Sequence, residues 1–366
     1  MKKIVLFIDN LGSGGAQRQI VNLGILLRNK GYDVSVLVYA DFPFYKSILD
    51  KYSIPLVMID GSNYILRIIK VRAFLRKCGA DVVITFLETP GFLGCISKIG
   101  GAKWKLITSE RSAKKETFTD KKTRFYNIFE RYSDAKVCNS ENARKMWEQY
   151  YPQYKDKYSV IYNPVILSTE VLEPKKKKSE DKILVTVAAS YQELKNPLRV
   201  IEALNLLSEE ERKKIRIEWY GRKEVVTGDT AIYEKAVQKI KEYKLQDSIQ
   251  LNAETSNIYQ LMIQSDAVGL FSTVEGLPNA ICEGMMLGKP IIMSRVSDYK
   301  VLADGNGIFC NAESPESIKG ALQKLLICSS DKLQEMGKYS QMKAEQLFSE
   351  KTVGEQWVDL IERLTK

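Results

Sequence analysis

The sequence predicts an α/β protein made of two doubly wound, parallel-sheet domains. Short runs of strand-forming apolar residues alternate with amphipathic helical segments along the chain. At 366 residues, the chain is longer than one ordinary hydrophobic core accommodates. A charged stretch at residues 173–181 has the composition of a linker. We therefore expect one domain over residues 1–165 and a second over residues 166–349.

Composition narrows the class of protein. Hydrophobic residues make up 45% of the chain and charged residues 27%, as in soluble globular proteins. No signal-peptide pattern opens the sequence, and the longest strongly apolar run, residues 4–8, is far too short to span a bilayer. The six cysteines never form a C-x-x-C pair, which favours buried free thiols in a reducing compartment. We expect a cytoplasmic protein.

The chain contains no histidine, which excludes several chemistries. Ser-His-Asp and Cys-His nucleophile systems, histidine metal sites and a histidine general base all need that side chain. The metal-binding pattern D-x-D is absent as well. We expect neither a metal nor a cofactor, so Lys, Arg and backbone N–H groups must neutralise any phosphate charge on a ligand.

The net positive charge of the chain lies in its first half. Residues 1–165 hold 27 Lys and Arg against 15 Asp and Glu, a net charge of +12, and the remainder carries −2. A basic half of this kind suits nucleic acid, an anionic membrane surface or an anionic small ligand. Charge alone does not choose among the three.

The first domain opens with a βαβ unit. A strand at residues 2–9, a glycine loop at 12–16, a helix at 17–29 that stops at Gly31 and a strand at 33–38 follow one another. The loop has the spacing G-x-G-G and no acidic residue ends the second strand, so it is not a dinucleotide fingerprint. It would still let a ligand approach the helix terminus; a plain tight turn is the alternative. Further strands are expected at residues 56–59, 82–86, 105–108, 136–138 and 159–162.

Two basic segments lie between these strands. The helix predicted over residues 65–77 is basic and amphipathic, and we interpret it as a sheet-packing helix with a solvated basic face rather than a membrane-docking one. Residues 103–124 contain eight cations, with Trp104 and Phe118 among them and Phe125 directly after them. Aromatic residues beside cations suit an anionic membrane interface or single-stranded nucleic acid, and a solvated loop is the alternative.

The second domain repeats the alternation. A buried strand begins at Lys182, and a helix follows over residues 196–207 with Pro197 in its first turn. Two helices containing Trp357 are expected over residues 331–366. The other elements are strands at residues 215–220, 249–251 and 308–310 and helices at 231–243, 258–264 and from Pro315 onward.

The stretch from residue 266 to residue 294 carries the candidate site. It predicts a strand at residues 267–271, a turn at Glu275-Gly276-Leu277-Pro278, a helix with Pro278 in its first position, and a next strand from Ile291 after the stop signals Gly288 and Pro290. This helix begins at the carboxyl end of a strand, where ligands bind in open α/β sheets.

Two carboxylates mark this helix. Glu283 lies four residues after Asn279, on the same helix face, and Glu275 precedes the helix. N–H groups at the positive end of a helix suit phosphate oxygens, and a carboxylate on each side suits hydroxyl groups. A nucleotide sugar has hydroxyls at both ends of a diphosphate. The alternative is a helix-terminal charge and an unrelated surface glutamate.

The same residues resemble a known family. Glu275-Gly-Leu-Pro, Glu283 and Gly288-Lys-Pro290 are similar to the E-x7-E signature of retaining glycosyltransferases of family four, which have the GT-B fold of two Rossmann-like domains facing across a cleft. The resemblance implies that Glu275 contacts the donor sugar, Glu283 binds the ribose, and Gly276, Leu277, Pro278 and Asn279 hold the diphosphate. It also implies that the terminal helix, residues 350–366, packs back on the first domain.

Further donor and acceptor residues follow from the resemblance. The family motif G-R-x4-K places its lysine at Lys195, which with Glu275 would be catalytic, but Ser190 stands where its arginine belongs. Arg222, after a neighbouring strand, is our candidate to replace that charge. The glycine loop implies acceptor contacts at Gly14, Gly15 and Arg18. Many members carry a cleft-facing histidine where this chain has Glu110 and Arg111, a departure that suits an acceptor with a phosphate.

We therefore expect a metal-independent, retaining hexosyltransferase. Its donor would be a UDP- or GDP-linked sugar, and its acceptor a glycan or a polyprenyl-diphosphate-linked glycan used in surface polysaccharide synthesis, at the inner face of the cell membrane. A sugar-nucleotide epimerase of the same fold is one alternative. A basic nucleic-acid-binding protein is another, although it leaves Glu275 and Glu283 without a role, and we expect no nucleic-acid partner.

Overall fold

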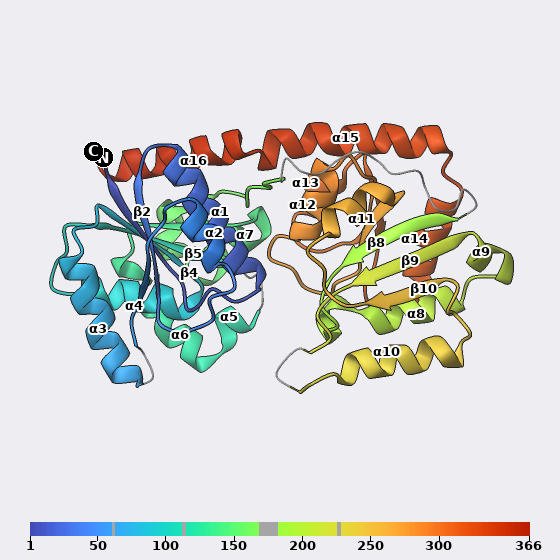
Figure 1. Ribbon diagram of the computed structural model, residues 1–366, viewed down its shortest axis with the longest axis horizontal. Helices are drawn as coiled ribbons and strands as arrows, with labels where there is room; N and C mark the ends of the chain where they lie inside the picture. Colours follow the sequence, from blue (N-terminus) through green and yellow to red (C-terminus); the bar gives the residue numbers. More distant parts are fainter. Residues whose placement is uncertain (61–62, 112–114, 168–181, 225–227) are drawn as a thin grey trace. The chain divides into compact units, whose positions relative to one another are not determined.

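The computed structural model describes residues 1–60, 63–111, 115–167, 182–224 and 228–366 (Figure 1). The charged stretch at residues 173–181 that we interpret as a linker lies outside these residues. The chain divides into two compact units. Unit 1 comprises Met1–Ile166 and Ser349–Lys366, and unit 2 comprises Leu167–Phe348.

Unit 1 contains a parallel sheet with the strand order β3-β2-β1-β4-β5-β6-β7 in its described part. Ile4 of the central strand pairs with Val34 on one side and Val82 on the other. Such strands are buried on both faces, which explains their continuous apolar runs. The strands are β1 Lys3–Phe7, β2 Asp33–Val38, β3 Leu56–Met58, β4 Val82–Phe86, β5 Lys105–Glu110, β6 Ala135–Cys138 and β7 Tyr158–Val160.

Helices cover both faces of this sheet. Alternate residues of β1 divide between them, since Ile4 and Leu6 pack with α1, α2 and α16, whereas Val5 and Phe7 pack with α3, α4 and α6. The helices are α1 Gly15–Asn29, α2 Lys46–Lys51, α3 Tyr64–Lys77, α4 Glu88–Lys98, α5 Glu116–Thr119, α6 Lys121–Ile128, α7 Glu141–Tyr150 and α16 Glu350–Leu364, with 3-10 turns η1 Phe129–Tyr132 and η2 Pro152–Lys157.

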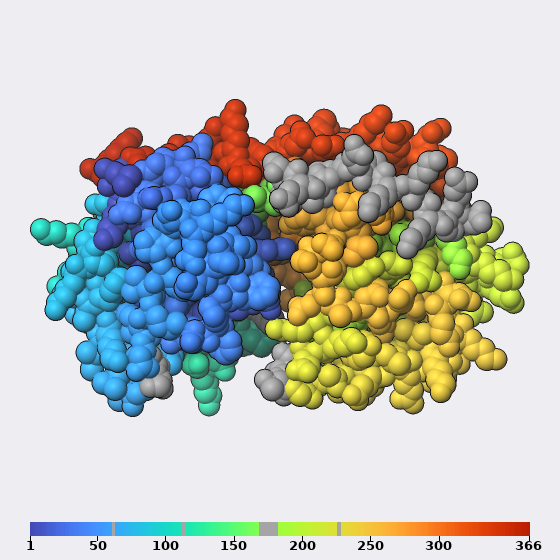
Figure 2. Space-filling model, in the orientation of Figure 1, coloured from blue at the N-terminus to red at the C-terminus, as the bar shows by residue number. Residues whose placement is uncertain are grey.

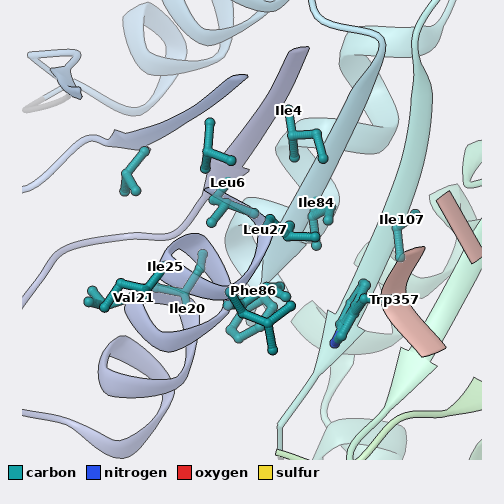
Figure 3. Packing of buried hydrophobic residues seen from close by; sticks show 14 of the residues in the cluster. Ile4, Leu6, Ile20, Val21, Ile25, Leu27, Ile84, Phe86, Ile107 and Trp357 are labelled. Atoms are coloured by element: carbon teal, nitrogen blue, oxygen red, sulfur yellow. The ribbon is translucent and has the colours of Figure 1, made fainter. Parts of the chain in front are cut away.

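The last helix belongs to the first unit. Trp357 of α16 is buried in the same cluster as Ile107 and Phe86 (Figure 3). The Tyr32 hydroxyl donates to Glu362 Oε1 at 2.9 Å, and Lys2 forms an ion pair with Glu362. These two contacts lower the pKa of Glu362, the Lys2 contact most strongly. The packing of α16 on unit 1 therefore combines apolar burial with a charged contact to Lys2, the residue before β1.

The basic segment at residues 103–124 differs from our expectation. Its described residues form β5, α5 and the start of α6, so the solvated loop that we gave as the alternative is not what they form. Trp104 and Phe118 are buried, with 4% and 3% of their surface exposed, so they cannot serve as surface aromatics. Phe125 alone of the three is exposed. The predicted row of aromatics beside cations is wrong because two of the rings complete cores.

Unit 2 contains a second parallel sheet, with the order β10-β9-β8-β11-β12-β13 among the described residues. Val185 pairs with Ile217 and with Ala267. The strands are β8 Ile183–Ala188, β9 Ile215–Tyr220, β10 Ile249–Asn252, β11 Ala267–Leu270, β12 Ile291–Ser294 and β13 Gly307–Cys310.

The helices of unit 2 also lie on both faces. One face packs with α8, α10 and α14 in a cluster around Val185, Val187 and Trp219. On the other, α12 packs against β11 and α15. The helices are α8 Pro197–Asn205, α9 Glu209–Lys213, α10 Ala231–Glu242, α11 Ile258–Gln264, α12 Asn279–Met286, α13 Tyr299–Ala303, α14 Pro315–Leu326 and α15 Ser330–Phe348, with the 3-10 turn η3 Glu193–Lys195.

Each sheet reverses its winding at one place. The order changes direction between β1 and β4 in unit 1 and between β8 and β11 in unit 2. Loops diverge at such a switch point and leave a crevice outside the carboxyl ends of the strands, where ligands bind in doubly wound sheets. The topology thus selects the loops after β8 and β11, and those after β1 and β4, as the places to look for sites.

Candidate active site

The switch point of unit 2 brings a lysine and a glutamate together. Lys195 ends η3, after β8, and its Nζ lies 2.5 Å from Glu275 Oε1 in the loop after β11. The Ser272 hydroxyl donates to the same carboxylate oxygen at 2.7 Å. The side chains of Lys195 and Glu275 are 21% and 12% exposed, so the pair is largely shielded from water yet reachable. An ion pair of this kind provides one cation and one hydrogen-bond acceptor within a single contact.

Helix α12 begins next to this pair. It starts at Asn279, and Pro278 takes the preceding N-cap position with ψ of 88°, so our expectation of Pro278 in the first helical position is wrong by one residue. The cause is that this ψ is not helical. The Ser297 hydroxyl donates to the Gly276 carbonyl oxygen and fixes the turn. The positive end of the helix dipole therefore opens at residues 276–279, beside Glu275.

Glu283 lies one turn inside α12. It is 4% exposed, so it is not a surface glutamate. The next residue, Gly284, faces β11, because a Cβ atom built there would lie 2.7 Å from Val268 Cγ2. Glycine thus lets the helix approach the strand closely and seats Glu283 at the sheet.

One buried asparagine joins three of the loops at this edge. Asn196, with φ of 68°, donates from Nδ2 to the Phe271 carbonyl at 3.1 Å and to the Ala312 carbonyl at 2.7 Å. These carbonyls follow β11 and β13, whereas Asn196 follows β8. The Thr273 N–H adds a bond to the Leu194 carbonyl at 2.9 Å. The position of Lys195 relative to Glu275 is therefore set by backbone contacts on both sides.

Arg222 and Ser190 lie on adjacent loops. A Cβ atom at Gly221 would lie 2.0 Å from the Ala189 carbonyl oxygen and 2.9 Å from Ser190 Cα, so only glycine permits this approach. The Tyr191 N–H donates to the Arg222 carbonyl at 3.0 Å. The Arg222 side chain is exposed. The structure thus brings Arg222 beside the position of the missing family arginine, and its role there stays a prediction.

Unit 1 has a cavity at its own switch point. Its volume is about 420 Å3, and Glu110, at the end of β5, lines it together with Asp9 after β1 and Glu88 after β4. Leu87, between β4 and α4, has φ of 75°, a conformation that side chains other than glycine rarely adopt. The remaining lining residues are Tyr39, Leu87, Thr89, Pro90, Glu116, Thr117, Asp120 and Thr123.

The cavity is acidic, although unit 1 as a whole is basic. Burial raises the pKa of Asp9, and hydrogen bonds from the Asn10 N–H and the Gln17 side chain partly offset this shift. Burial, and after it the charge of Asp9, raises the pKa of Tyr39 to about 12. Carboxylates and a neutral phenol accept hydrogen bonds from hydroxyl or amino groups, and the carboxylates repel phosphate. The cavity therefore suits a sugar rather than an anion.

The other predicted acceptor residues lie outside the cavity lining. Gly14 caps α1 and Gly15 begins it, and neither they nor Arg18 are among the lining residues. Arg111 stacks on Phe86, with its guanidinium carbon 3.7 Å from the ring centroid, and donates to Asn163 Oδ1 at 2.8 Å. Burial lowers the pKa of Arg111 to about 9, which leaves it charged at neutral pH. Of the five predicted residues, only Glu110 faces the cavity.

Several site residues have no signal that we used in the sequence. Asn196 is recognisable only as an asparagine before a proline, and Ser272 and Ser297 are ordinary loop serines. Asp9 and Glu88 carry a weak signal, because each is the second residue after the end of a buried strand. Among the described residues, no three His, Cys, Asp or Glu side chains gather so as to hold a metal ion, and no helix is long and apolar enough to cross a bilayer.

The two parallel-sheet units, each with its loops at the switch point, have the architecture of the GT-B fold class. Solved structures of that class are similar over nearly the whole chain. Anabaena HepE in complex with UDP and glucose matches with a TM-score of 0.84 and 18% identity, covering 99% of this chain and 100% of the other. A lipopolysaccharide outer core galactosyltransferase matches with a TM-score of 0.74 and 15% identity, covering 99% of each chain.

Family models place the chain more closely. The model of glycosyl transferases group 1 matches residues 168–343, and that of glycosyltransferase family 4 matches residues 13–169. The chain belongs to the group 1 glycosyltransferases with the GT-B fold. This confirms the family resemblance and the fold class that the sequence predicts.

Two relatives come from Campylobacter jejuni. GalNAc-α-(1→4)-GalNAc-α-(1→3)-diNAcBac-PP-undecaprenol α-1,4-N-acetyl-D-galactosaminyltransferase is 24% identical over 294 residues, which cover 78% of this chain and 77% of the relative. N-acetylgalactosamine-N,N'-diacetylbacillosaminyl-diphospho-undecaprenol 4-α-N-acetylgalactosaminyltransferase is 22% identical, covering 91% of this chain and 92% of the relative. Both are transferases, as is this chain.

Proposed function

We propose that this glycosyltransferase moves a hexosyl unit from a nucleotide-diphosphate sugar to a hydroxyl group of a polyprenyl-diphosphate-linked glycan. The observation that carries the donor assignment is the Lys195–Glu275 pair beside the start of α12, with Glu283 buried one turn further on. A diphosphate across the helix terminus would meet Lys195, the sugar hydroxyls would meet Glu275, and the ribose hydroxyls would meet Glu283.

The reaction can proceed without a metal and without a histidine. As the bond between the anomeric carbon and the diphosphate oxygen breaks, negative charge grows on the leaving diphosphate. Lys195 and the N-terminal end of α12 stabilise that charge, and exposed Arg222 adds to it from the next loop. The acceptor oxygen forms its bond on the face that the diphosphate leaves, and the acceptor proton passes to the departing phosphate oxygen. The anomeric configuration is thereby retained.

The acceptor assignment draws on the cavity of unit 1 and on the relatives. Carboxylates and threonine hydroxyls of that cavity suit the hydroxyls of a terminal sugar. The two Campylobacter relatives are named for undecaprenol-diphosphate acceptors, which supports a lipid-linked glycan here as well. Such an acceptor would hold the protein at the periphery of a membrane. Synthesis of a surface polysaccharide is the process that we propose for it.

A nucleotide-sugar panel tests the donor half of this proposal. We expect a UDP- or GDP-linked sugar at about 100 times its Kd to stabilise the protein by about 2.7 kcal/mol in thermal unfolding. Glu283→Gln should weaken UDP binding but leave the binding of 2′,3′-dideoxy-UDP unchanged, because only the ribose hydroxyls need this carboxylate. Glu242→Gln, an exposed glutamate of α10, is the matched control.

Two results would contradict the proposal. If no nucleotide or nucleotide sugar stabilises the protein, the donor site is not where we place it. If the bound donor is consumed equally fast with and without a lipid-linked acceptor, and an epimer is the product, the chain is an epimerase of this fold.

A further inference from the structure

The outer sides of α3 and α6 expose large apolar side chains. Ile65 and Ile69 of α3 are 67% and 56% exposed, and Phe125 and Ile128 of α6 are 52% and 50% exposed. Leu66 is exposed in addition. We call these five residues and the cations around them the α3–α6 face. Ile65 and Ile69 are four residues apart and so occupy one stripe, on a different side of α3 from the buried Val71 and Leu75 that hold the helix on the sheet.

The two helices form one continuous surface. The hydroxyls of Tyr64, in α3, and Tyr126, in α6, lie 2.8 Å apart. Phe92 of α4 stacks on Tyr126, with ring centroids 4.2 Å apart, and lies 6.0 Å from the ring of Phe125. The start of α3 and the middle of α6 therefore meet over α4. Figure 1 shows all three helices on the same side of unit 1, and part of α3 is at the surface in the view of Figure 2.

The charges on this face have one sign. No Asp or Glu occurs from residue 63 to residue 77 or from residue 121 to residue 129. Glu130 follows, but it is buried and pairs with Lys136 at 3.2 Å. At the margins, Asp120 caps α6 and exposed Asp60 pairs with Lys70 at 3.7 Å. The exposed cations are Lys70, Arg76, Lys77, Lys121, Lys122 and Arg124.

Apolar side chains surrounded by cations are the pattern of a helix surface that lies on an anionic bilayer. The apolar residues enter the boundary between headgroups and acyl chains, and each nearby Lys or Arg gains attraction from anionic lipid. Our expectation of a merely solvated basic face on α3 therefore leaves out its exposed isoleucines. We propose that the α3–α6 face docks unit 1 on an anionic lipid bilayer. This inference rests on the proposed function only in that a lipid-linked acceptor would lie in that same membrane.

Nucleic acid fits this face less well. Binding of single strands relies on aromatic side chains that stack on bases, whereas four of the five apolar residues of this face are aliphatic. The exposed aromatic rings on α3 and α6 are Phe125 and Tyr64, and Tyr64 is 41% exposed with its hydroxyl bonded to that of Tyr126. The buried Trp104 and Phe118 cannot contribute. Aliphatic side chains cannot stack on bases, but they are stabilised on entering a lipid boundary, because the hydrophobic effect depends on the apolar area removed from water and not on ring shape.

Vesicle sedimentation tests the proposal with the full chain. We expect binding to vesicles of 30% phosphatidylglycerol in phosphatidylcholine and not to vesicles of phosphatidylcholine alone. Lys121→Gln with Arg124→Gln should weaken that binding about thirtyfold, from the attraction of two basic residues. Ile65→Ser with Ile69→Ser should weaken it about tenfold or more, because two exposed apolar side chains no longer enter the bilayer.

Matched controls come from unit 2. Lys235→Gln with Lys241→Gln removes two exposed lysines of α10, and Ile327→Ser removes an apolar side chain that is 84% exposed. Neither control should alter vesicle binding. Thermal unfolding and UDP binding of every variant establish that it is folded, so a failure of the donor proposal is measured separately from a failure of docking.

The outcomes divide clearly. Vesicle binding that persists in both α3–α6 variants, or that is equal for neutral and anionic vesicles, overturns the proposal. So does binding of single-stranded nucleic acid that these substitutions abolish while vesicle binding is unaffected.

Discussion

At the residue scale, the state of Lys195 decides what the donor site can do. In the structure its ammonium group lies 2.5 Å from Glu275, and both side chains are mostly shielded. The pair is held by an unusual backbone, since Asn196 directly after the lysine has a left-handed conformation and bonds two further loops. A diphosphate that approaches must therefore share or replace the carboxylate as partner of Lys195.

This competition gives the two partners opposite effects on diphosphate binding. Lys195→Met should weaken UDP binding about tenfold to a hundredfold, the worth of a charge-assisted hydrogen bond. Glu275→Gln should leave UDP binding unchanged or tighten it, because it releases the lysine, yet it should abolish sugar transfer. Isothermal titration of UDP and turnover of the identified donor measure the two effects.

Stability provides the control on this prediction. Lys195→Met leaves a mostly buried carboxylate without its cation, and we expect a loss of roughly 1–3 kcal/mol in urea unfolding. Lys235→Met, on exposed α10, should change neither binding nor stability. The idea fails if Glu275→Gln weakens UDP binding as much as Lys195→Met does, since the carboxylate would then position the lysine rather than compete for it.

The sequence predicts these residues unevenly. Glu275 and Glu283 are marked by their spacing around the start of a helix, whereas Lys195 follows from the family resemblance. The structure brings Lys195 and Glu275 into contact. Asp9 and Glu88 depend on three distant strands ending at one cavity, which no local pattern reveals. Arg111 carries the charge that suits a phosphate, but its packing on Phe86 and its bond to Asn163 were not readable from its neighbours in the chain.

At the scale of elements, the close packing of α12 on β11 fixes the position of the helix. A Cβ atom at Gly284 would lie 2.7–3.0 Å from three atoms of Val268, nearer than real Cβ contacts come. At the far end, Gly288 has φ of 69° and its N–H donates to the Met285 carbonyl at 2.9 Å, a glycine helix stop of the kind the sequence predicts. The helix is thus fixed at its middle and its end, which fixes its N-terminal opening too.

Gly284→Ala tests whether this packing positions the site. The added methyl overpacks the contact with Val268, so we expect a loss of about 1–3 kcal/mol in urea unfolding. UDP binding should weaken as well, since the helix can relieve the clash only by moving. Gly320→Ala is the matched control, because no atom lies within 4 Å of its added Cβ in α14, and it should gain about 0.5–1 kcal/mol. A Gly284→Ala variant with unchanged stability and UDP affinity would show that the contact between α12 and β11 can accommodate a methyl group.

At the scale of the whole molecule, the chain returns to its first unit at the end. Helix α16 brings Trp357, which is 1% exposed, into the core of unit 1, although all of unit 2 lies between α16 and the rest of unit 1 in the sequence. The alternating pattern predicts the two sheets, but not the pairing of strands or the reversal at β1/β4 and β8/β11. Those features depend on long-range packing rather than on local propensity. That the last helix belongs with unit 1 follows from the family resemblance alone.

This arrangement predicts that a change in the core of unit 1 lowers the stability of that unit alone, whereas donor binding raises the stability of unit 2 alone. Trp357→Ala removes a large side chain from the core of unit 1, and we expect it to destabilise that unit by about 3–5 kcal/mol. UDP at about 100 times its Kd should stabilise unit 2 by about 2.7 kcal/mol.

The corresponding change in unit 2 is Leu322→Ala, at a buried residue of α14, which should lower the stability of unit 2 by about 2–5 kcal/mol. In scanning calorimetry we expect Trp357→Ala to lower one transition, and Leu322→Ala to lower the one that UDP raises. A Trp357→Ala shift of the UDP-sensitive transition would mean that the units unfold together, so that loss of the last helix alone would disable the donor site.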